Sequence, residues 1–259
     1  MVKYIILILL DILIFTLNAH AHENNFIKMA YYENFHPFSI KSNGMVKGIF
    51  VDYIEYIFAK SNDYKIISDA FPWERAQDFV RKDKYDAHVT LKNSKREAYL
   101  LAGNTPVFED ELVIVYSVTN NKIKEIEKID SLDKLREFQI NDYIGNSRIS
   151  SYSEEKGFHL NLFSNIEDAY EKLFINKGDV IISSKIIADI EIKQNYEKAL
   201  KYKKIDFIFD NKLTYYFMVR KSRKDAEKIV NIFEKNIKLD KNKLKLKELY
   251  KKYVEEYKY

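Results

Sequence analysis

Apolar and polar residues follow two different periods along this chain. Short, mostly apolar runs typical of buried strands lie at 26–31, 64–68, 85–91, 112–117, 138–144, 179–183 and 213–219. Between them are stretches whose apolar residues share one helical face, such as 50–60. Strands that alternate with such helices predict an α/β fold, with parallel strands joined by crossover helices.

Local signals indicate where some helices begin and where the chain changes region. Pro72 favours a helix start, and Asn165 can cap another helix with Asp168 three residues on. Two amphipathic helices are predicted at 224–239 and 244–255. The polar stretch 120–128 has no periodicity, and we expect the chain to pass into a second lobe there.

The first 21 residues have the pattern of a cleaved secretory signal peptide. Lys3 gives a positive start, residues 4–17 are mostly apolar, and an Ala-His-Ala triplet at 19–21 is a cleavage signal. The apolar run is short for a bilayer span and contains Asp11, so retention as a membrane anchor is the less favoured alternative. We therefore expect a periplasmic protein whose mature form begins near His22.

Cysteine content and charge further restrict the class of protein and its partners. The 259 residues include no cysteine, so we expect no disulfide, no thiol chemistry and no lipid anchor on an N-terminal cysteine. The formal net charge is +4, and 234–259 holds nine lysines against five acidic residues. A nucleic-acid or membrane patch is one interpretation. The interleaved acids and the predicted export favour a solvated helix face and no nucleic-acid partner.

Arginine is scarce, with 7 among 43 basic residues. Because lysine supplies the bulk charge, an arginine here is more informative: its planar fork binds a carboxylate through two hydrogen bonds, which lysine cannot do. Arg75, Arg96 and Arg148 fall in the motifs described next. Arg81 and Arg223 lie outside them, and we expect alanine at either position to leave ligand affinity nearly intact.

Several short motifs occur in a characteristic order along 26–254. They are Phe35-His36-Pro37-Phe38, Gly48-Ile49-Phe50-Val51-Asp52-Tyr53, Pro72-Trp73-Glu74-Arg75-Ala76, Asp86-Ala87, Lys95-Arg96, Thr105-Pro106, Ile144-Gly145-Asn146-Ser147 and Gly178-Asp179-Val180. No single motif is specific. Together they resemble the periplasmic solute-binding proteins of amino-acid-type ABC importers (family 3), in a variant with Pro-Trp-x-Arg-Ala.

The resemblance implies a two-lobed periplasmic-binding-protein fold of type II, an α/β architecture with the ligand cleft between the lobes. Two crossover strands would form the hinge. Lobe 1 would be discontinuous, comprising 22–116 and 212–259, and lobe 2 would comprise 117–211. The expected function is capture of a small carboxylate-bearing solute, amino-acid-like or another organic anion, by lobe closure. The expected partner is the membrane permease of an ABC importer, and the protein is expected to be a monomer.

The resemblance also implies ligand-binding residues in the first lobe. Arg96 would grip the ligand carboxylate, with Thr90 on the strand before it; the alternative is a surface arginine paired with Glu97. Trp73 and Arg75 follow the Pro72 helix start, where the only tryptophan of the chain could stack on the ligand or anchor the helix. Phe35 would close over the ligand, and Tyr32 lies three residues before it.

In the second lobe the implied site is a loop that enters a helix. Asn146, Ser147 and Arg148 follow Gly145, and backbone N–H groups at a helix start attract anions. Amino-acid binders usually carry an aspartate for the ligand ammonium at the position of Ser184. No acid is present at 183–185, so the ammonium partner is either missing or supplied elsewhere, for instance by Glu33 or Glu74. This departure favours an anionic solute without an α-amine.

Catalysis and cofactors have little support in the sequence. The histidines are scattered without metal-ligand spacing, and no phosphate-binding or dinucleotide glycine motif is present, so we expect no metal, no cofactor and no enzyme activity. One alternative is a cyclohexadienyl-dehydratase-like enzyme on the same fold, with Glu33, Glu74 or His88 as general acid. Another is a sensor that presents its ligand to a separate receptor.

Overall fold

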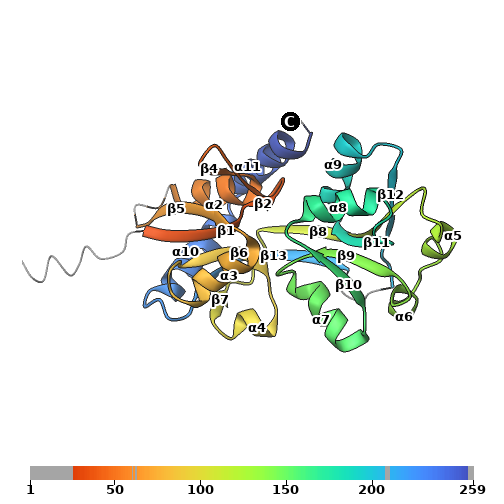
Figure 1. Ribbon diagram of the computed structural model, residues 1–259. Coiled ribbons are helices and arrows are strands. Elements are labelled where there is room, and N and C mark those ends of the chain that lie inside the picture. Colours follow the sequence, from red (N-terminus) through yellow and green to blue (C-terminus); the bar gives the residue numbers. More distant parts are fainter. Residues whose placement is uncertain (1–25, 60, 62, 208–210, 256–259) are drawn as a thin grey trace, which may run out of the picture.

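The computed structural model describes residues 26–59, 61, 63–207 and 211–255. The predicted signal peptide at 1–21 and the expected mature start at His22 lie outside the described residues. Two α/β lobes stand side by side and are joined by two strands, β8 and β13 (Figure 1). In chain order the elements up to the first crossing are β1 (Phe26–Tyr32), β2 (Asn34–Phe35), β3 (Ser39–Ser42), β4 (Met45–Lys47), α2 (Ile49–Ala59), β5 (Lys65–Phe71), α3 (Trp73–Arg81), β6 (Ala87–Leu91), α4 (Ser94–Glu97), β7 (Leu100–Ala102) and β8 (Phe108–Ser117).

The second lobe follows, and the chain then returns to the first. The elements of the second lobe are α5 (Ile123–Ile126), α6 (Leu132–Leu135), β9 (Gln139–Tyr143), α7 (Ser147–Lys156), β10 (His159–Phe163), α8 (Ile166–Phe174), β11 (Val180–Ser184), α9 (Lys185–Asn195) and β12 (Leu200–Lys204). The returning elements are β13 (Lys212–Arg220), α10 (Ala226–Ile237), α11 (Asp240–Tyr250) and a π-helical turn at Lys251–Glu255. The strands predicted at 26–31, 64–68, 85–91, 138–144, 179–183 and 213–219 are confirmed as β1, β5, β6, β9, β11 and β13.

One curved sheet runs through both lobes. Its strand order is β10-β9-β11-β8-β13-β6-β1-β5, with β7 beside β13 and β12 beside β8; β2, β3 and β4 form a small separate sheet. β1 is parallel to β5 and β6, and β9 is parallel to β10 and β11. β8 and β13 are antiparallel to their neighbours. The predicted parallel strands therefore lie within each lobe, and antiparallel pairing occurs where the chain crosses.

β8 is longer than the apolar run at 112–117 suggested. Its first residues alternate between partly buried and exposed, because Glu109 and Glu111 face solvent. Up to Glu111 it pairs with β13, and from Leu112 onward with β11, so it changes neighbour in mid-strand. The expected lobe boundaries, 116/117 and 211/212, remain a prediction; they fall near the end of β8 and just before β13.

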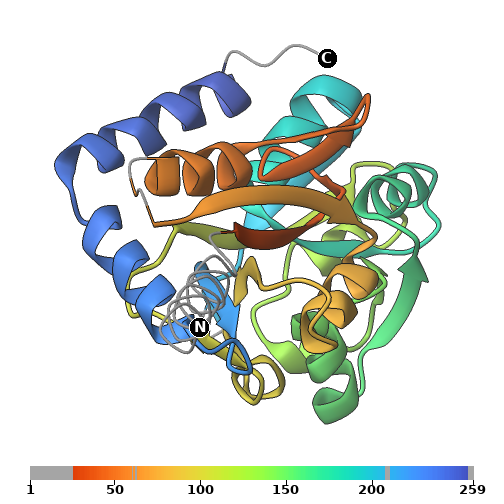
Figure 2. The ribbon, with the colours of Figure 1, turned by 90° about the vertical axis from the view of Figure 1, so that its left-hand side faces the viewer.

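Helices cover the sheet with the faces that their patterns predict. α2 buries Phe50, Tyr53 and Phe58, and α10 buries Ile229 and Phe233. Figure 2 looks onto the end of the first lobe and shows α10 and α11 following one another around its outside. The described lysines of 234–255 are exposed or half-buried on these helices and on the π-helical turn, and several pair with acids. This arrangement fits the solvated-face interpretation.

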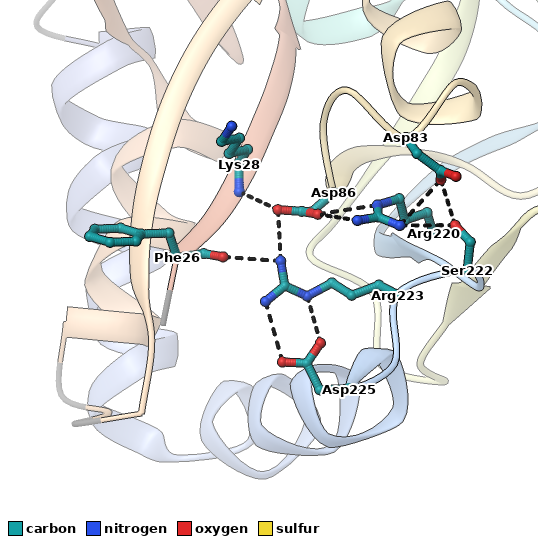
Figure 3. Close-up of polar contacts among 8 residues, drawn as sticks. All are labelled: Phe26, Lys28, Asp83, Asp86, Arg220, Ser222, Arg223 and Asp225. Atoms are coloured by element: carbon teal, nitrogen blue, oxygen red, sulfur yellow. Dashed lines mark hydrogen bonds and ion pairs between the residues drawn. The ribbon is translucent and has the colours of Figure 1, made fainter. Parts of the chain in front are cut away.

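A buried ion-pair network centred on Asp86 joins the two chain segments of the first lobe (Figure 3). The Asp86 carboxylate accepts a hydrogen bond from the backbone N–H of Lys28 at 2.9 Å. It also pairs with Arg223 at 2.7 Å and with Arg220 at 3.0 Å. Arg223 pairs in addition with Asp225 at 2.6 Å. Arg223 is therefore buried and holds the first lobe together. The expectation that alanine at this position leaves ligand affinity nearly intact remains a prediction.

Candidate ligand site between the lobes

A cavity of about 80 Å³ lies between the lobes, and residues of both lobes line it. Its walls are mainly aromatic and aliphatic, and none of its lining residues is acidic. The predicted site residues that line it are Tyr32, Phe35, Trp73, Thr90, Arg96, Asn146, Arg148 and Ser184. An enclosed, largely apolar cavity with a few convergent polar groups is the usual form of a small-molecule site.

One predicted site residue does not line this wall, and for another only the backbone is described. Arg75 is exposed on α3 and does not line the cavity. The buried face of that helix carries Trp73, Ala76 and Val80, and a residue two positions after Trp73 points to the opposite side. Ser147 is the first residue of α7, so its backbone lies at the predicted helix start.

Aromatic rings from both lobes meet across the cavity. The Tyr32 ring of lobe 1 stacks on the Tyr143 ring of lobe 2, with centroids 5.4 Å apart. Tyr32 also stacks on Phe35 at 5.7 Å and lies 6.3 Å from Trp73. Sequence reasoning missed Tyr143. The available signal was its place at the carboxyl end of a parallel strand, where ligand-binding residues gather in α/β sheets.

Arg96 is buried, at 5% exposure, in the wall of the cavity. Asn93 caps its short helix by accepting the Arg96 backbone N–H at 2.8 Å. The guanidinium donates to Gln77 Oε1 from Nε at 3.2 Å and Nη2 at 2.9 Å, and to the Leu91 carbonyl from Nη1 at 3.0 Å. Its centre lies 5.5 Å from the Trp73 ring. All of these partners are uncharged.

The charge of Arg96 therefore has no counter-ion in the part of the chain that the structure describes. No ion pair joins it to a carboxylate there, and the alternative pairing with Glu97 is not formed. Burial lowers the pKa of this guanidinium, which reflects the cost of a desolvated charge. A buried charge without an opposite partner is strongly unfavourable. An anion in the cavity would supply that partner.

Ser184 and Asp110 form a second polar group at the hinge side of the cavity. The Ser184 hydroxyl caps α9 and donates to Asp110 Oδ2, and the Ile186 backbone N–H donates to the same oxygen at 3.2 Å. Burial raises the pKa of Asp110, although these hydrogen bonds oppose the shift. Sequence reasoning missed Asp110, because the acidic stretch 109–111 was not assigned to a strand. Its neighbour on the same strand face, Leu112, lines the cavity.

The acids proposed as replacements for the one missing at Ser184 lie elsewhere. Glu33 and Glu74 do not line the cavity. His88 is fully buried behind Trp73, with ring centroids 5.5 Å apart, and does not line it either. Burial lowers the pKa of His88 to about 3, so its imidazole is neutral near pH 7. Among the described residues, no group of three histidine, cysteine or acidic side chains could hold a metal ion.

The loop between β9 and α7 contacts the first lobe closely. Gly145 has a φ of +93°, and a Cβ there would lie 3.2 Å from both the Trp73 ring and the Glu74 backbone nitrogen. Beneath the loop, Asn146 donates to Asp142 Oδ1 at 2.9 Å. Asp142 is 2% exposed, and burial raises its pKa to about 7. The absence of a side chain at Gly145 allows this close approach of the lobes.

Two α/β lobes, two crossing strands and a lined cavity between them define a two-lobed solute-binding protein. Residues 27–256 match the family model of bacterial extracellular solute-binding proteins, family 3, and the chain belongs to this family. A comparison with curated protein sequences gives no significant match. None of the described helices is long and apolar enough to cross a membrane.

Solved structures share the fold at low sequence identity. A substrate-binding protein of an amino-acid ABC transporter has a TM-score of 0.71 and 17% identity, covering 89% of this chain and 99% of that one. A structure from work on glutathione import through the cystine ABC importer of Streptococcus mutans has 0.73 and 22%, covering 89% and 95%. An ancestral amino-acid-binding protein, a precursor of cyclohexadienyl dehydratase, has 0.68 and 17%, covering 89% and 95%.

Proposed function

We propose that this protein captures a small carboxylate-bearing solute in the periplasm and delivers it to the permease of an ABC importer. The observation that carries the proposal is Arg96: a buried guanidinium with only neutral partners, in the wall of a cavity between two lobes. A solute carboxylate would replace the lost solvation through charge-assisted, bidentate hydrogen bonds. The family membership supports the solute-binding role.

Lobe closure would convert binding energy into a conformational signal. A ligand stabilises the closed form only through contacts that the open form lacks. Arg96, Thr90 and Trp73 line the cavity from lobe 1, and Asn146 and Arg148 line it from lobe 2. A solute held between these groups touches both lobes at once, so closing about β8 and β13 is coupled to occupancy.

The wall chemistry supports an organic anion with an apolar body and no free amine. Seven aromatic residues line the cavity, and none of its lining residues is acidic. An ammonium group buried there would meet no carboxylate in the wall, and the nearby Asp110 is already engaged by Ser184 and Ile186. A hydroxy or keto acid avoids that desolvation penalty.

A binding role without catalysis is supported by the positions of the candidate acids. The dehydratase alternative needs a general acid in the cleft, whereas Glu33, Glu74 and His88 all lie outside the cavity wall. His88, with its pKa of about 3, holds no proton to donate as an imidazolium near pH 7. The sensor alternative differs only in the protein that receives the loaded form.

Mass spectrometry of the purified protein tests this proposal directly, because a tight binder retains its solute. We expect a small carboxylic acid to be released on denaturing the wild type and to be absent from Arg96→Ala. Loss of the buried charge contact should weaken binding by about 2–5 kcal/mol. Arg96→Lys should recover little, since lysine lacks the fork.

Arg81→Ala is the matched control, because Arg81 is exposed and pairs with its helix neighbour Asp78 at 2.5 Å. It should retain the solute. Equal losses in Arg81→Ala and Arg96→Ala would show that general charge attraction accounts for binding. Release of a solute without any acidic group would contradict the carboxylate assignment.

A further inference from the structure

Gln77 lies where the two lobes meet, and its side-chain amide bonds to both. It belongs to α3 of lobe 1, and its Oε1 accepts both the Nε and the Nη2 hydrogen bonds of Arg96. Its Nε2 donates to the carbonyl oxygen of Gly145, on the β9–α7 loop of lobe 2, at 3.3 Å. The chemistry fixes this orientation: a guanidinium can only donate and a carbonyl can only accept.

The amide also determines which part of Arg96 is left for a solute. A guanidinium has five N–H groups, and the hydrogen bonds to Gln77 and Leu91 use one each on Nε, Nη1 and Nη2. One N–H therefore remains on each Nη atom. Two neighbouring N–H groups match the spacing of a carboxylate. If the guanidinium turned about its axis, this pair would no longer be presented.

The same residues lie beside a second groove. Arg96 lines both the interlobe cavity and a second groove on the surface, and Gln77 and Gly145 line that groove. Any separation of the lobes would take the Gly145 carbonyl away from Gln77. Once the Gly145 carbonyl has moved away, the amide is fixed at one end only, through its hydrogen bonds to Arg96. The lobe contact therefore adds a second anchor to the amide that orients Arg96.

We propose that Gln77 is a closure latch: a positioning residue that orients Arg96 for a carboxylate and, through the same amide, stabilises the contact between the lobes. The role of Arg96 in this inference rests on the proposed function, but the latch itself acts in the solute-free protein. Glutamine suits the position because a glutamate would neutralise Arg96 and compete with a solute carboxylate. The neutral carbonyl orients the guanidinium and leaves its charge unmatched.

Distance measurements between the lobes test the latch without any solute. The chain has no cysteine, so cysteines introduced at Lys228 and Asp133, exposed in the two lobes, carry the only spin labels. We expect Gln77→Met, which keeps the length but removes both hydrogen-bonding ends, to raise the open-to-closed ratio about fivefold, the effect of one neutral hydrogen bond. Gln77→Glu keeps the acceptor for Arg96, loses the donor and places a negative charge against the Gly145 carbonyl, so it should open the lobes at least as much.

Arg81→Met is the control on the same helix, four residues on and exposed, and it should keep the wild-type distances. If Gln77→Met and Gln77→Glu both match the wild type, the latch is refuted. A solute-free wild type with no closed population refutes it as well. If the Gln77 variants keep the wild-type distances while the wild type retains a solute, the latch is contradicted and the proposed function is not. Retention of solute by Arg96→Ala contradicts the proposed function and leaves the distance comparison valid.

Discussion

Arg96 is buried and Asp110 is half-buried near the cavity, and the two charges have different kinds of hydrogen-bond partner. Asp110 accepts hydrogen bonds from a hydroxyl and from the backbone N–H groups of Ile186 and Glu111. These donors suit its ionised form. Arg96 has only neutral acceptors. The site therefore presents the unpaired positive charge of Arg96, whereas the carboxylate of Asp110 already accepts hydrogen bonds from the protein. This arrangement favours anions.

The contact between Ser184 and Asp110 changes what a substitution at Ser184 should do. Ser184→Asp would place two carboxylates within hydrogen-bonding distance of each other, and we expect it to destabilise the fold by about 1–3 kcal/mol. Adding Asp110→Asn should restore most of that stability. Urea unfolding of the single and double variants measures this directly.

The double variant also moves the acid into the cavity wall. Calorimetric titration with 3-phenyllactate and L-phenylalanine, a matched hydroxy and amino acid, should then show weaker binding of the former relative to the latter. Tight binding by the wild type that depends on the amine would contradict the proposed preference for anions. A single variant as stable as the wild type would contradict the contact between positions 184 and 110.

Asp142 should make stability fall as pH rises. Its pKa is raised to about 7 in the folded protein, so between pH 4 and 7 the native state binds a proton that the unfolded chain has released. The stability that the protonated form provides is present at pH 4 and lost through pH 7. Asp142→Asn should therefore be more stable than the wild type at pH 8, by up to about 4 kcal/mol, and equal to it near pH 4.

Urea unfolding at pH 4.5, 6 and 8 would follow this difference. His88, whose pKa is lowered to about 3, makes stability fall on acidification from about pH 6.5, but it is present in both proteins and cancels. Parallel pH profiles for wild type and Asp142→Asn would contradict the prediction.

Strands and helices with strong local patterns were predictable, and those shaped by partners were not. β1, β13, α2 and α10 follow their apolar periods closely. The start of β8 was missed because charged residues on an exposed strand face give a pattern that resembles a turn. α9 was missed although Ser184 caps it, since its run of isoleucines fits a buried strand as well as a helix.

The site was predictable to the extent that motifs encode it. Arg96, Trp73 and Asn146 come from such motifs and line the cavity. Gln77 carries no local signal, because its importance arises only when α3 and the β9–α7 loop meet in space. Tyr143 had only the signal of its place at the carboxyl end of a parallel strand. Arg75 comes from the same kind of motif but is exposed on α3 and does not line the cavity, because the helical period turns it to solvent.

The loop at Gly145 should control how closely the lobes approach. Gly145→Ala would place a Cβ 3.2 Å from Trp73 and Glu74, and we expect a larger radius of gyration and about tenfold weaker solute retention. Gly157→Ala is the matched control: it also has a positive φ, +71°, at the other end of α7, but nothing lies within 4 Å of its added methyl group.

Both alanine variants should lose about 1–2 kcal/mol of stability from backbone strain. Only Gly145→Ala should change small-angle scattering and solute retention. If the two variants behave alike in scattering, the contact between the lobes at Gly145 does not limit closure.

The Asp86 network should decide whether the first lobe holds together. Arg223→Ala removes one side of two buried ion pairs, at 2.7 and 2.6 Å, and should destabilise the protein by about 3–5 kcal/mol in urea unfolding. Arg136→Ala, at an exposed pair with Asp133, should change stability by less than about 1 kcal/mol. Similar losses in both variants would contradict a special role for the network.

The place of β13 has a consequence for how the protein is made. It is the last strand that the structure describes, yet it lies in the middle of the sheet, between β8 and β6. A chain made amino end first therefore completes β9 to β12 before the first lobe receives its central strand. Until residue 219 has emerged, β6 keeps an unpaired edge, and such edges invite aggregation. The second lobe is made of continuous chain and can fold while the first one waits.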